Sequence, residues 1–178
     1  MSKETLIWFD YEKCSQCHGC EVACRSWRAL TQGVRHRRVL NIWRGSYPKV
    51  KSHSVSIGCL HCVAPACAAV CPVEAIGKRE SDGLVWVDEK ICTGCQACLE
   101  ACPYGVPQFD LDGIMQKCDL CTDQAGKEYG PPCVATCPGG ALSLKVVEAD
   151  EKKRHQKAVL LLMASAEAVH GANASQNH

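Results

Sequence analysis

Stretches of alternating or continuous hydrophobic residues are short in this chain, and they predict short strands separated by turns. The segment SDGLVWVD at 81–88 begins with an Asp-Gly turn and continues with alternation, as expected for a strand entered from a hairpin. A second Asp-Gly pair at 112–113 precedes two apolar residues and predicts another turn into a short strand. Two more β-like pieces occur around 39–43 and 50–57.

The last part of the sequence has the pattern of a helix. Residues 150–171 are charged at first and then apolar through 158–164. This apolar run falls far short of the roughly 20 residues that cross a bilayer. We therefore expect a helix that packs on the protein body or on a partner, with no direct membrane span. The residues after it, 172–178, form a tail that we expect to be disordered.

Cysteine dominates the candidate chemistry, with 16 among 178 residues. The cysteines fall into four sets of four, and the third set reads C-x2-C-x2-C-x3-C-P, the spacing with which bacterial ferredoxins bind cubane iron–sulfur clusters. Sixteen thiolates, divided among sites of four, predict four [4Fe–4S] clusters as the cofactors. In sequence order the sets are Cys14, Cys17, Cys20, Cys24; Cys59, Cys62, Cys67, Cys71; Cys92, Cys95, Cys98, Cys102; and Cys118, Cys121, Cys133, Cys137.

Two other uses of cysteine compete with iron–sulfur clusters. A disulfide scaffold fits badly, because repeated C-x-x-C pairs cross-link a protein inefficiently and the first ten residues hold no apolar run typical of a secretion signal. The fourth set, C-x2-C-x11-C-x3-C, would pass for a structural zinc site if it stood alone. Beside three ferredoxin-type sets it favours iron, and a zinc-binding interaction module remains a remote alternative.

The cysteine sets indicate an internal ferredoxin repeat. Three of the four end in Cys-Pro, and two of these continue alike, as CPVEAI at 71–76 and CPGGAL at 137–142. The proline is expected to end the ligand-bearing turn, and the apolar pair that follows to start a strand. The first set has no proline after Cys24, so a short helix can continue through 25–28. We also expect the fourth cysteine of a set to begin a helix and to point away from the cluster held by the other three.

In two-cluster ferredoxins that fourth cysteine ligates the neighbouring cluster. The hairpin between the second and third sets predicts that these sets share two clusters, which leaves the first and fourth sets to share the other two. Sequential pairing, first with second and third with fourth, is the alternative; the short run from 102 to 118 lacks the strand and hairpin that it would need. The crossed arrangement predicts four ligand sets: Cys14, Cys17, Cys20 and Cys137; Cys24, Cys118, Cys121 and Cys133; Cys59, Cys62, Cys67 and Cys102; Cys71, Cys92, Cys95 and Cys98.

These patterns predict an α+β, loop-rich protein with two ferredoxin-like dicluster lobes, which is a four-cluster polyferredoxin. The outer lobe would comprise 1–54 and 103–149, and the inner lobe 55–102, followed by the helix at 150–171 and the tail. Aromatic residues are few, at two Phe, four Trp and four Tyr. The clusters must therefore serve as much of the core, and the iron-free protein is expected to be largely unfolded.

The charge balance excludes some functions and marks one basic segment. The net charge of +1 gives no reason to expect nucleic acid as a partner. Between 25 and 53, however, the sequence has eight Lys or Arg and no Asp or Glu. A solvated basic loop is one explanation; in the other, Arg35, Arg37 and Arg38 face a partner surface or offset the negative charge of thiolate-ligated clusters. No Ser/His/Asp constellation, phosphate loop or open metal site suggests catalysis, so we expect a non-catalytic electron-transfer protein.

Four longer motifs give a family resemblance. The runs SIGCLHCVAPACAAVCPVEAI, DEKICTGCQACLEACPYGVPQFD, GIMQKCDLC and CVATCPGGAL resemble the iron–sulfur electron-transfer subunit of the dimethyl sulfoxide reductase family, over about 6–144. The resemblance implies a four-cluster protein bound to a large catalytic subunit with a molybdenum or tungsten pterin cofactor. It also implies that the Cys14 cluster lies nearest that subunit and that the Cys71 cluster faces the second redox partner. A hydrogenase, carbon monoxide dehydrogenase or formate dehydrogenase is the alternative partner.

The resemblance also bears on residues beside the ligands and on location. His61 and Lys117 match family positions from which a side chain could donate hydrogen bonds to cluster sulfur and tune its potential; simple packing and surface charge are the alternatives. His18 has no such match and is expected to be structural. We expect no C-terminal extension that docks a membrane anchor, which leaves open whether the second partner is a membrane anchor or a soluble carrier. The expected location is cytoplasmic, with export in complex with a signal-bearing partner as the alternative.

Overall fold

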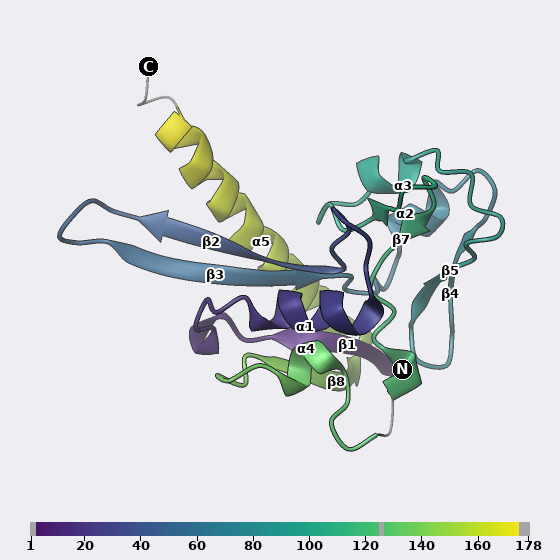
Figure 1. Ribbon diagram of the computed structural model, residues 1–178, viewed down its shortest axis with the longest axis horizontal. Coiled ribbons are helices and arrows are strands. Elements are labelled where there is room, and N and C mark those ends of the chain that lie inside the picture. The colour runs from purple at the N-terminus through teal and green to yellow at the C-terminus, as the bar shows by residue number, and fades with distance from the viewer. Residues whose placement is uncertain (1–2, 125–126, 175–178) are drawn as a thin grey trace.

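The computed structural model describes residues 3–124 and 127–174. This part of the protein forms four separate two-stranded antiparallel sheets, joined by loops and short helices. Figure 1 shows these small sheets in separate parts of the molecule, with no large sheet among the described residues. The architecture is the mixed helix and strand type that the short hydrophobic stretches predict.

Two strands that are far apart in the sequence, one before the first cysteine set and one after the fourth, pair in one sheet. β1 (Lys3–Phe9) pairs antiparallel with β8 (Leu142–Glu148), with Lys3 opposite Glu148 and Phe9 opposite Leu142. The strand β8 begins directly after the Ala that follows CPGG, as predicted. This pairing brings the N-terminal segment, and with it the first cysteine set, next to the fourth set.

Helices carry the first and fourth cysteine sets against each other. The turn η1 (Tyr11–Lys13) leads from β1 to the first set, and α1 (Gly19–Arg28) continues through Cys24 to the Trp-Arg pair, as the missing proline predicts. α1 packs against α4 (Pro132–Ala135), which carries a cysteine of the fourth set.

A long hairpin and the last helix extend together from the body. β2 (Arg37–Arg44) and β3 (Lys51–Gly58) pair antiparallel and confirm the two β-like pieces near 39–43 and 50–57. The helix α5 (Ala149–Ala174) packs against β2, and Figure 1 shows both projecting to the same side. It includes the predicted 150–171 and runs to Ala174; of the expected tail, residues 175–178 lie outside the described part. No helix in the described part of the protein has the length and apolarity to cross a membrane.

The second and third cysteine sets lie together in another region (Figure 1). Their helices α2 (Ala66–Ala69) and α3 (Ala97–Glu100) pack against each other. β4 (Ile76–Lys78) and β5 (Val85–Val87) form the predicted hairpin, in which Gly83 takes a positive φ of 72° in the Asp-Gly turn.

The second Asp-Gly turn leads into a smaller hairpin. β6 (Gln108–Phe109) pairs with β7 (Met115–Gln116), and a 3-10 turn, η2 (Thr122–Gln124), follows within the fourth cysteine set. Gly113 has a positive φ of 77°, as this kind of turn requires.

The short helices differ from the prediction in their position relative to the cysteines. We expected the fourth cysteine to begin a helix, but in three sets the helix contains the third cysteine and ends before the fourth. α2, for example, contains Cys67 and stops at Ala69, ahead of Cys71. The physical reason is the proline after the fourth cysteine, which disfavours helical backbone in the residue before it.

Cysteine side chains are part of both groups of buried side chains. The larger group joins Ile7, Phe9, Val55 and Leu142 to buried cysteines that include Cys20. The smaller group consists of Ile76, Val85, Cys98 and Met115, with more cysteines packed around it. Both groups support the prediction that what the cysteines bind completes the core.

A buried histidine on α5 gives a prediction for pH dependence. The His155 ring stacks on Trp8 at 4.0 Å between ring centroids, and Lys145 lies over the Trp8 ring. Burial, followed by the charge of Lys145, lowers the pKa of His155 to about 4 from 6.5. Between pH 6.5 and about 4 the unfolded protein therefore binds a proton at this histidine more readily than the folded protein does. As the pH falls through this range, the free energy of unfolding should decrease by up to about 3 kcal/mol.

In the variant His155→Phe this loss should disappear, because phenylalanine stacks without binding a proton. Urea unfolding followed by circular dichroism at several pH values measures the difference between wild type and variant. His53→Phe, at an exposed position, serves as the control and should keep the wild-type slope. A slope in His155→Phe equal to that of the wild type would contradict the prediction.

Candidate cluster-binding sites

One cavity is lined by four cysteines from two different sets. Cys71, Cys92, Cys95 and Cys98 surround it, together with apolar residues that include Phe109. These are the four cysteines that crossed pairing predicts for one cluster. A set of thiols around a cavity suits a multi-atom cluster, whereas a single zinc ion needs four sulfurs at about 2.3 Å from one point.

The loop through this site depends on a close backbone approach. Gly94 has a positive φ of 66°, and a Cβ atom at this position would lie 2.4 Å from the carbonyl oxygen of Gly113. No larger residue fits there unless the backbone moves, so the glycine between Cys92 and Cys95 is a steric requirement. The loop holds Cys92 and Cys95 on one wall of the cavity.

A second group joins Cys102 to the second cysteine set. Burial and the thiolates of Cys59 and Cys102 raise the pKa of Cys62 to about 12. Burial and the same two thiolates raise the pKa of Cys67 to about 11. The four side chains are thus close enough to repel one another as anions, which brings Cys102 beside the second set.

A third group joins Cys24 to the fourth set. Burial raises the pKa of Cys24 to about 12, and Cys133 and Cys121 contribute to the increase. Cys118 also has its pKa raised to about 12, by burial first, with Cys133 among the further causes. Each of these neighbours is one that crossed pairing predicts for Cys24.

Close backbone contacts connect the remaining loops, those of the first set and of Cys137. A Cβ atom on Gly19 would lie 3.3 Å from Thr136, the residue before Cys137. A Cβ atom on Gly139 would lie 2.3 Å from the carbonyl oxygen of Lys13, the residue before the first cysteine. The first glycine of CPGGAL is therefore needed for the two loops to touch. These contacts bring the loop of the first set next to the loop of Cys137.

Burial of the thiols sets a condition on metal binding. A thiol with a pKa near 12, such as Cys24 or Cys118, stays protonated at neutral pH, so iron has to displace the protons when it binds. In the part of the protein that the structure describes, no three His, Cys, Asp or Glu side chains converge where one metal ion would bind.

Arg37 is a buried cation among the thiols of the first and fourth sets. It is 4% exposed, and its guanidinium donates to the Ser56 hydroxyl at 3.1 Å. Burial opposes the charge, but the thiolates of Cys133 and Cys118 outweigh burial and raise the pKa of Arg37. Of the two explanations of the basic segment, this position fits the one in which arginine offsets thiolate charge. Arg35, in contrast, is exposed.

We expect Arg37→Met to destabilise the protein by about 3–5 kcal/mol, because it leaves buried negative charge without its cation. The measurement is the urea concentration at which the cluster absorbance is lost under anaerobic conditions. Arg35→Met is the matched control and should behave as the wild type. Equal resistance of both variants to urea would contradict the role of Arg37 as a counter-cation.

His61 holds an unsatisfied polar atom next to the second cysteine set. The backbone N–H of Val85 donates to His61 Nδ1 at 3.0 Å, so the proton of the neutral ring lies on Nε2. Burial, with the charges of Lys117 and Lys152, lowers the pKa of His61 well below 6.5 and keeps the ring neutral. Nε2 is buried and has no hydrogen-bond partner among the described residues. A cluster held between Cys59 and Cys62 would provide a sulfur acceptor, so the residues fit the implied cofactor.

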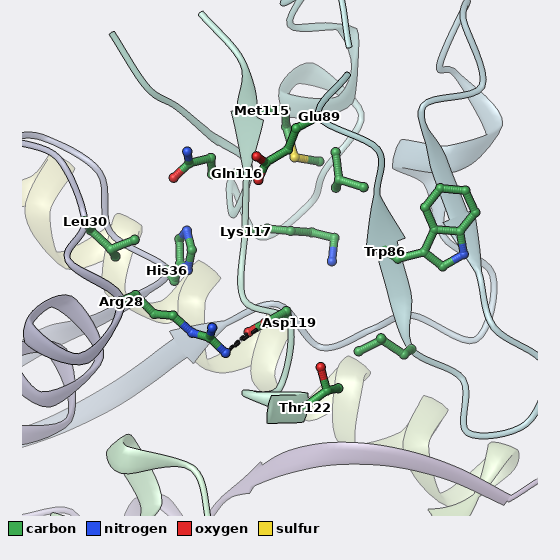
Figure 2. Close-up of a pocket in the computed structure, with 12 residues that line it drawn as sticks. Arg28, Leu30, His36, Trp86, Glu89, Met115, Gln116, Lys117, Asp119 and Thr122 are labelled. Atoms are coloured by element: carbon green, nitrogen blue, oxygen red, sulfur yellow. Dashed lines mark hydrogen bonds and ion pairs between the residues drawn. The ribbon is translucent and has the colours of Figure 1, made fainter. Parts of the chain in front are cut away.

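Lys117 is buried between two of the cysteine groups. Its ammonium donates to two backbone carbonyls, those of Val85 and Cys118. Lys117 also lines a second cavity, together with Trp86 and the Arg28–Asp119 ion pair. Figure 2 shows its side chain extending toward the strand of Trp86, above that ion pair. Lys117 thus uses carbonyl acceptors, and its charge lies among thiols.

Several residues near the cysteines were not foreseen from the sequence. Arg28 pairs with Asp119 at 2.8 Å and Asp123 at 2.6 Å, which ties α1 to the fourth set. Glu4 and Lys152 form a buried ion pair at 3.0 Å. Only the helical spacing of Lys152 with other buried residues of α5 could have suggested it. His18 hydrogen-bonds Glu21 and Asn41, as a structural histidine does.

The fold and these sites define an iron–sulfur electron-transfer protein, and comparisons with known proteins agree. Residues 50–147 match the family model of the 4Fe-4S dicluster domain. The B subunit of the anaerobic dimethyl sulfoxide reductase of Escherichia coli is 39% identical over 162 residues, covering 86% of this protein and 78% of that subunit. The formate dehydrogenase iron-sulfur subunit of Wolinella succinogenes is 40% identical over 159 residues, covering 76% of this protein and 78% of that subunit.

A third relative matches a smaller part. The hydrogenase-2 operon protein HybA of Escherichia coli O157:H7 is 42% identical over 106 residues, covering 54% of this protein and 32% of HybA. The protein described here belongs to the family of iron–sulfur subunits of dimethyl sulfoxide reductase and its relatives. The family resemblance seen in the cysteine motifs is thereby confirmed.

Proposed function

We propose that this protein carries four [4Fe–4S] clusters and relays electrons between a large molybdenum- or tungsten-pterin catalytic subunit and a second redox partner. When bound, each cluster supplies a one-electron centre. The protein itself is proposed to be non-catalytic. Its own residues hold the clusters near one another, exclude water and set the local charge.

The observation that carries the proposal is the cavity lined by Cys71, Cys92, Cys95 and Cys98. It gathers one cysteine from the second set and three from the third, as the crossed ligation of a dicluster ferredoxin requires. A structural zinc site built from one set would not draw its fourth cysteine from another.

The helix packing supports the other proposed ligand sets. α1 lies against α4, and α2 lies against α3, so the first and fourth sets are neighbours and the second and third sets are neighbours. Sequential pairing would need α1 beside α2 instead. We propose two dicluster lobes on this basis, 1–54 with 103–149 as the outer lobe and 55–102 as the inner lobe.

The two ends of the proposed relay are assigned by family likeness. The cluster on Cys14, Cys17, Cys20 and Cys137 would face the catalytic subunit, and the cluster in the four-cysteine cavity would face a membrane anchor or a soluble carrier. Cluster assembly is proposed to take place in the cytoplasm, either as the final location or before export with a partner.

Metal analysis of the anaerobically purified protein tests the proposal. Four cubanes require about 16 iron and 16 sulfide per molecule, a brown colour, and electron paramagnetic resonance of interacting one-electron centres after reduction. Zinc in place of iron would overturn the electron-transfer function. About eight iron per molecule, the content of two cubanes, would keep that function and refute the count of four.

A second candidate keeps the relay and changes the catalytic partner to a hydrogenase. The likeness to HybA, a hydrogenase operon protein, is the observation in its favour. Purification of the intact complex separates the two candidates, since a pterin with molybdenum or tungsten supports the first and nickel supports the second.

A further inference from the structure

Three charged side chains form a buried ion network that the cysteine motifs do not include. Glu4 on β1 accepts from Lys78 on β4 at 2.7 Å and from Lys152 on α5 at 3.0 Å. Lys152 is fully buried and also donates to the carbonyl of Thr5 at 3.1 Å. The network therefore joins the N-terminal strand and the C-terminal helix to the hairpin between the second and third cysteine sets.

The network lies against the loops of one proposed cluster site. Lys78 Nζ also donates to the carbonyl of Val63 at 2.8 Å, the residue after Cys62. One turn along α5 from Lys152, the carbonyl of Gln156 accepts from the hydroxyl of Tyr104 at 3.1 Å, two residues after Cys102. Helix and hairpin thus contact both loops that would hold the cluster on Cys59, Cys62, Cys67 and Cys102.

The charges of the network do not cancel. Two ammonium groups share the carboxylate of Glu4, which leaves one net positive charge in a region largely closed to water. An unbalanced buried charge is costly unless an opposite charge is near. The positive charge lies beside this site, since Lys78 donates to the carbonyl of the residue after Cys62 and shares Glu4 with Lys152. A thiolate-ligated cluster would supply the missing negative charge.

We propose that Lys152 and Lys78, held in place by Glu4, raise the reduction potential of the cluster on Cys59, Cys62, Cys67 and Cys102. Adding an electron to a cluster makes it more negative, so a fixed cation nearby favours the reduced form. This inference rests on the proposed function. It adds that the reduction potential of one cluster is set in part by charged residues outside the cysteine sets. These residues act through their charge and do not bind the cluster.

Paired substitutions of opposite sign test the inference in the intact complex. Lys152→Met removes a cation while keeping a side chain of similar length, and should lower the potential of this cluster, shifting its oxidised-to-reduced ratio about tenfold, or about 59 mV for one electron. Glu4→Gln removes the carboxylate of the network and should shift the ratio by a similar factor in the opposite direction. Potentiometric titration followed by electron paramagnetic resonance measures both, and the signal lost in Cys62→Ser identifies the cluster.

Lys153→Met is the matched control, because Lys153 is the exposed neighbour of Lys152 on the same helix; its titration should equal that of the wild type. Shifts of the same sign in Lys152→Met and Glu4→Gln, or no shift in Glu4→Gln, would overturn the inference. If Lys152→Met fails to assemble, Lys78→Met takes its place with the same expected direction. Iron and sulfide content of the wild type tests the proposed function separately, so failure of one is distinguished from failure of the other.

Discussion

Anaerobic removal of iron is expected to unfold most of this protein. Buried side chains form two small groups, and cysteines belong to both. The free energy of binding structural metal is about 10–16 kcal/mol in small zinc domains, which equals or exceeds the about 5–15 kcal/mol that stabilises an ordinary domain. Many of the cysteine side chains left behind are buried or half-buried, and contacts among them do not replace the bonds to the metal.

The measurement is far-ultraviolet circular dichroism with amide hydrogen exchange before and after treatment with an iron chelator. We expect loss of amide protection in both cysteine regions, with the β2–β3 hairpin keeping at most weak residual structure, because an isolated hairpin is marginally stable. Reconstitution with iron and sulfide under reducing conditions is the control for irreversible damage. A cooperative unfolding transition retained by the iron-free protein would contradict the expectation.

Substitution of a fourth cysteine should damage the cluster of a different set. Cys102→Ser is expected to abolish or alter the paramagnetic signal that Cys62→Ser removes, and to leave the signal that Cys95→Ser removes. The reason is that Cys102 lies among the thiols of the second set, where it raises the pKa of Cys62 and Cys67. The iron content should fall by between about one and four atoms, according to whether a three-iron cluster remains.

Cys24→Ser provides the corresponding test in the other region. Its difference spectrum should match that of Cys121→Ser, because Cys24 neighbours Cys133 and Cys121. Cys17→Ser is the comparison and should remove a different signal. If the spectra of Cys24→Ser and Cys17→Ser coincide, crossed ligation is refuted. All four cysteines of the first set would then bind the same cluster.

Local features of this fold could be predicted because they depend on neighbouring residues. The Asp-Gly pairs at 82–83 and 112–113 indicated both turns, and the glycine of each has a positive φ. Strands after CPVEAI and CPGGAL follow from the proline that ends each ligand turn. The helix through 25–28 follows from the absence of that proline.

Features that depend on distant residues could not be predicted. The pairing of β1 with β8 joins residues more than a hundred positions apart. The sequence of neither strand indicates which strand it pairs with. Glu4 and Lys152 look like surface charges in a sequence, because their burial depends on each other. The helix starts were misplaced, since the expected helix at the fourth cysteine ignored the restriction that a following proline imposes.

The pairing of β1 with β8 also has a consequence for synthesis on the ribosome. β1 is translated more than a hundred residues before β8, and several of its side chains are apolar and buried in the final structure. Its partner β8 is complete only when residue 148 has been translated, so β1 has unpaired edges until then. The ligands proposed for the inner lobe, which end at Cys102, are complete much earlier. The inner lobe should therefore fold and bind its clusters before the outer lobe. Pairing of β1 with β8 should be the last step of folding.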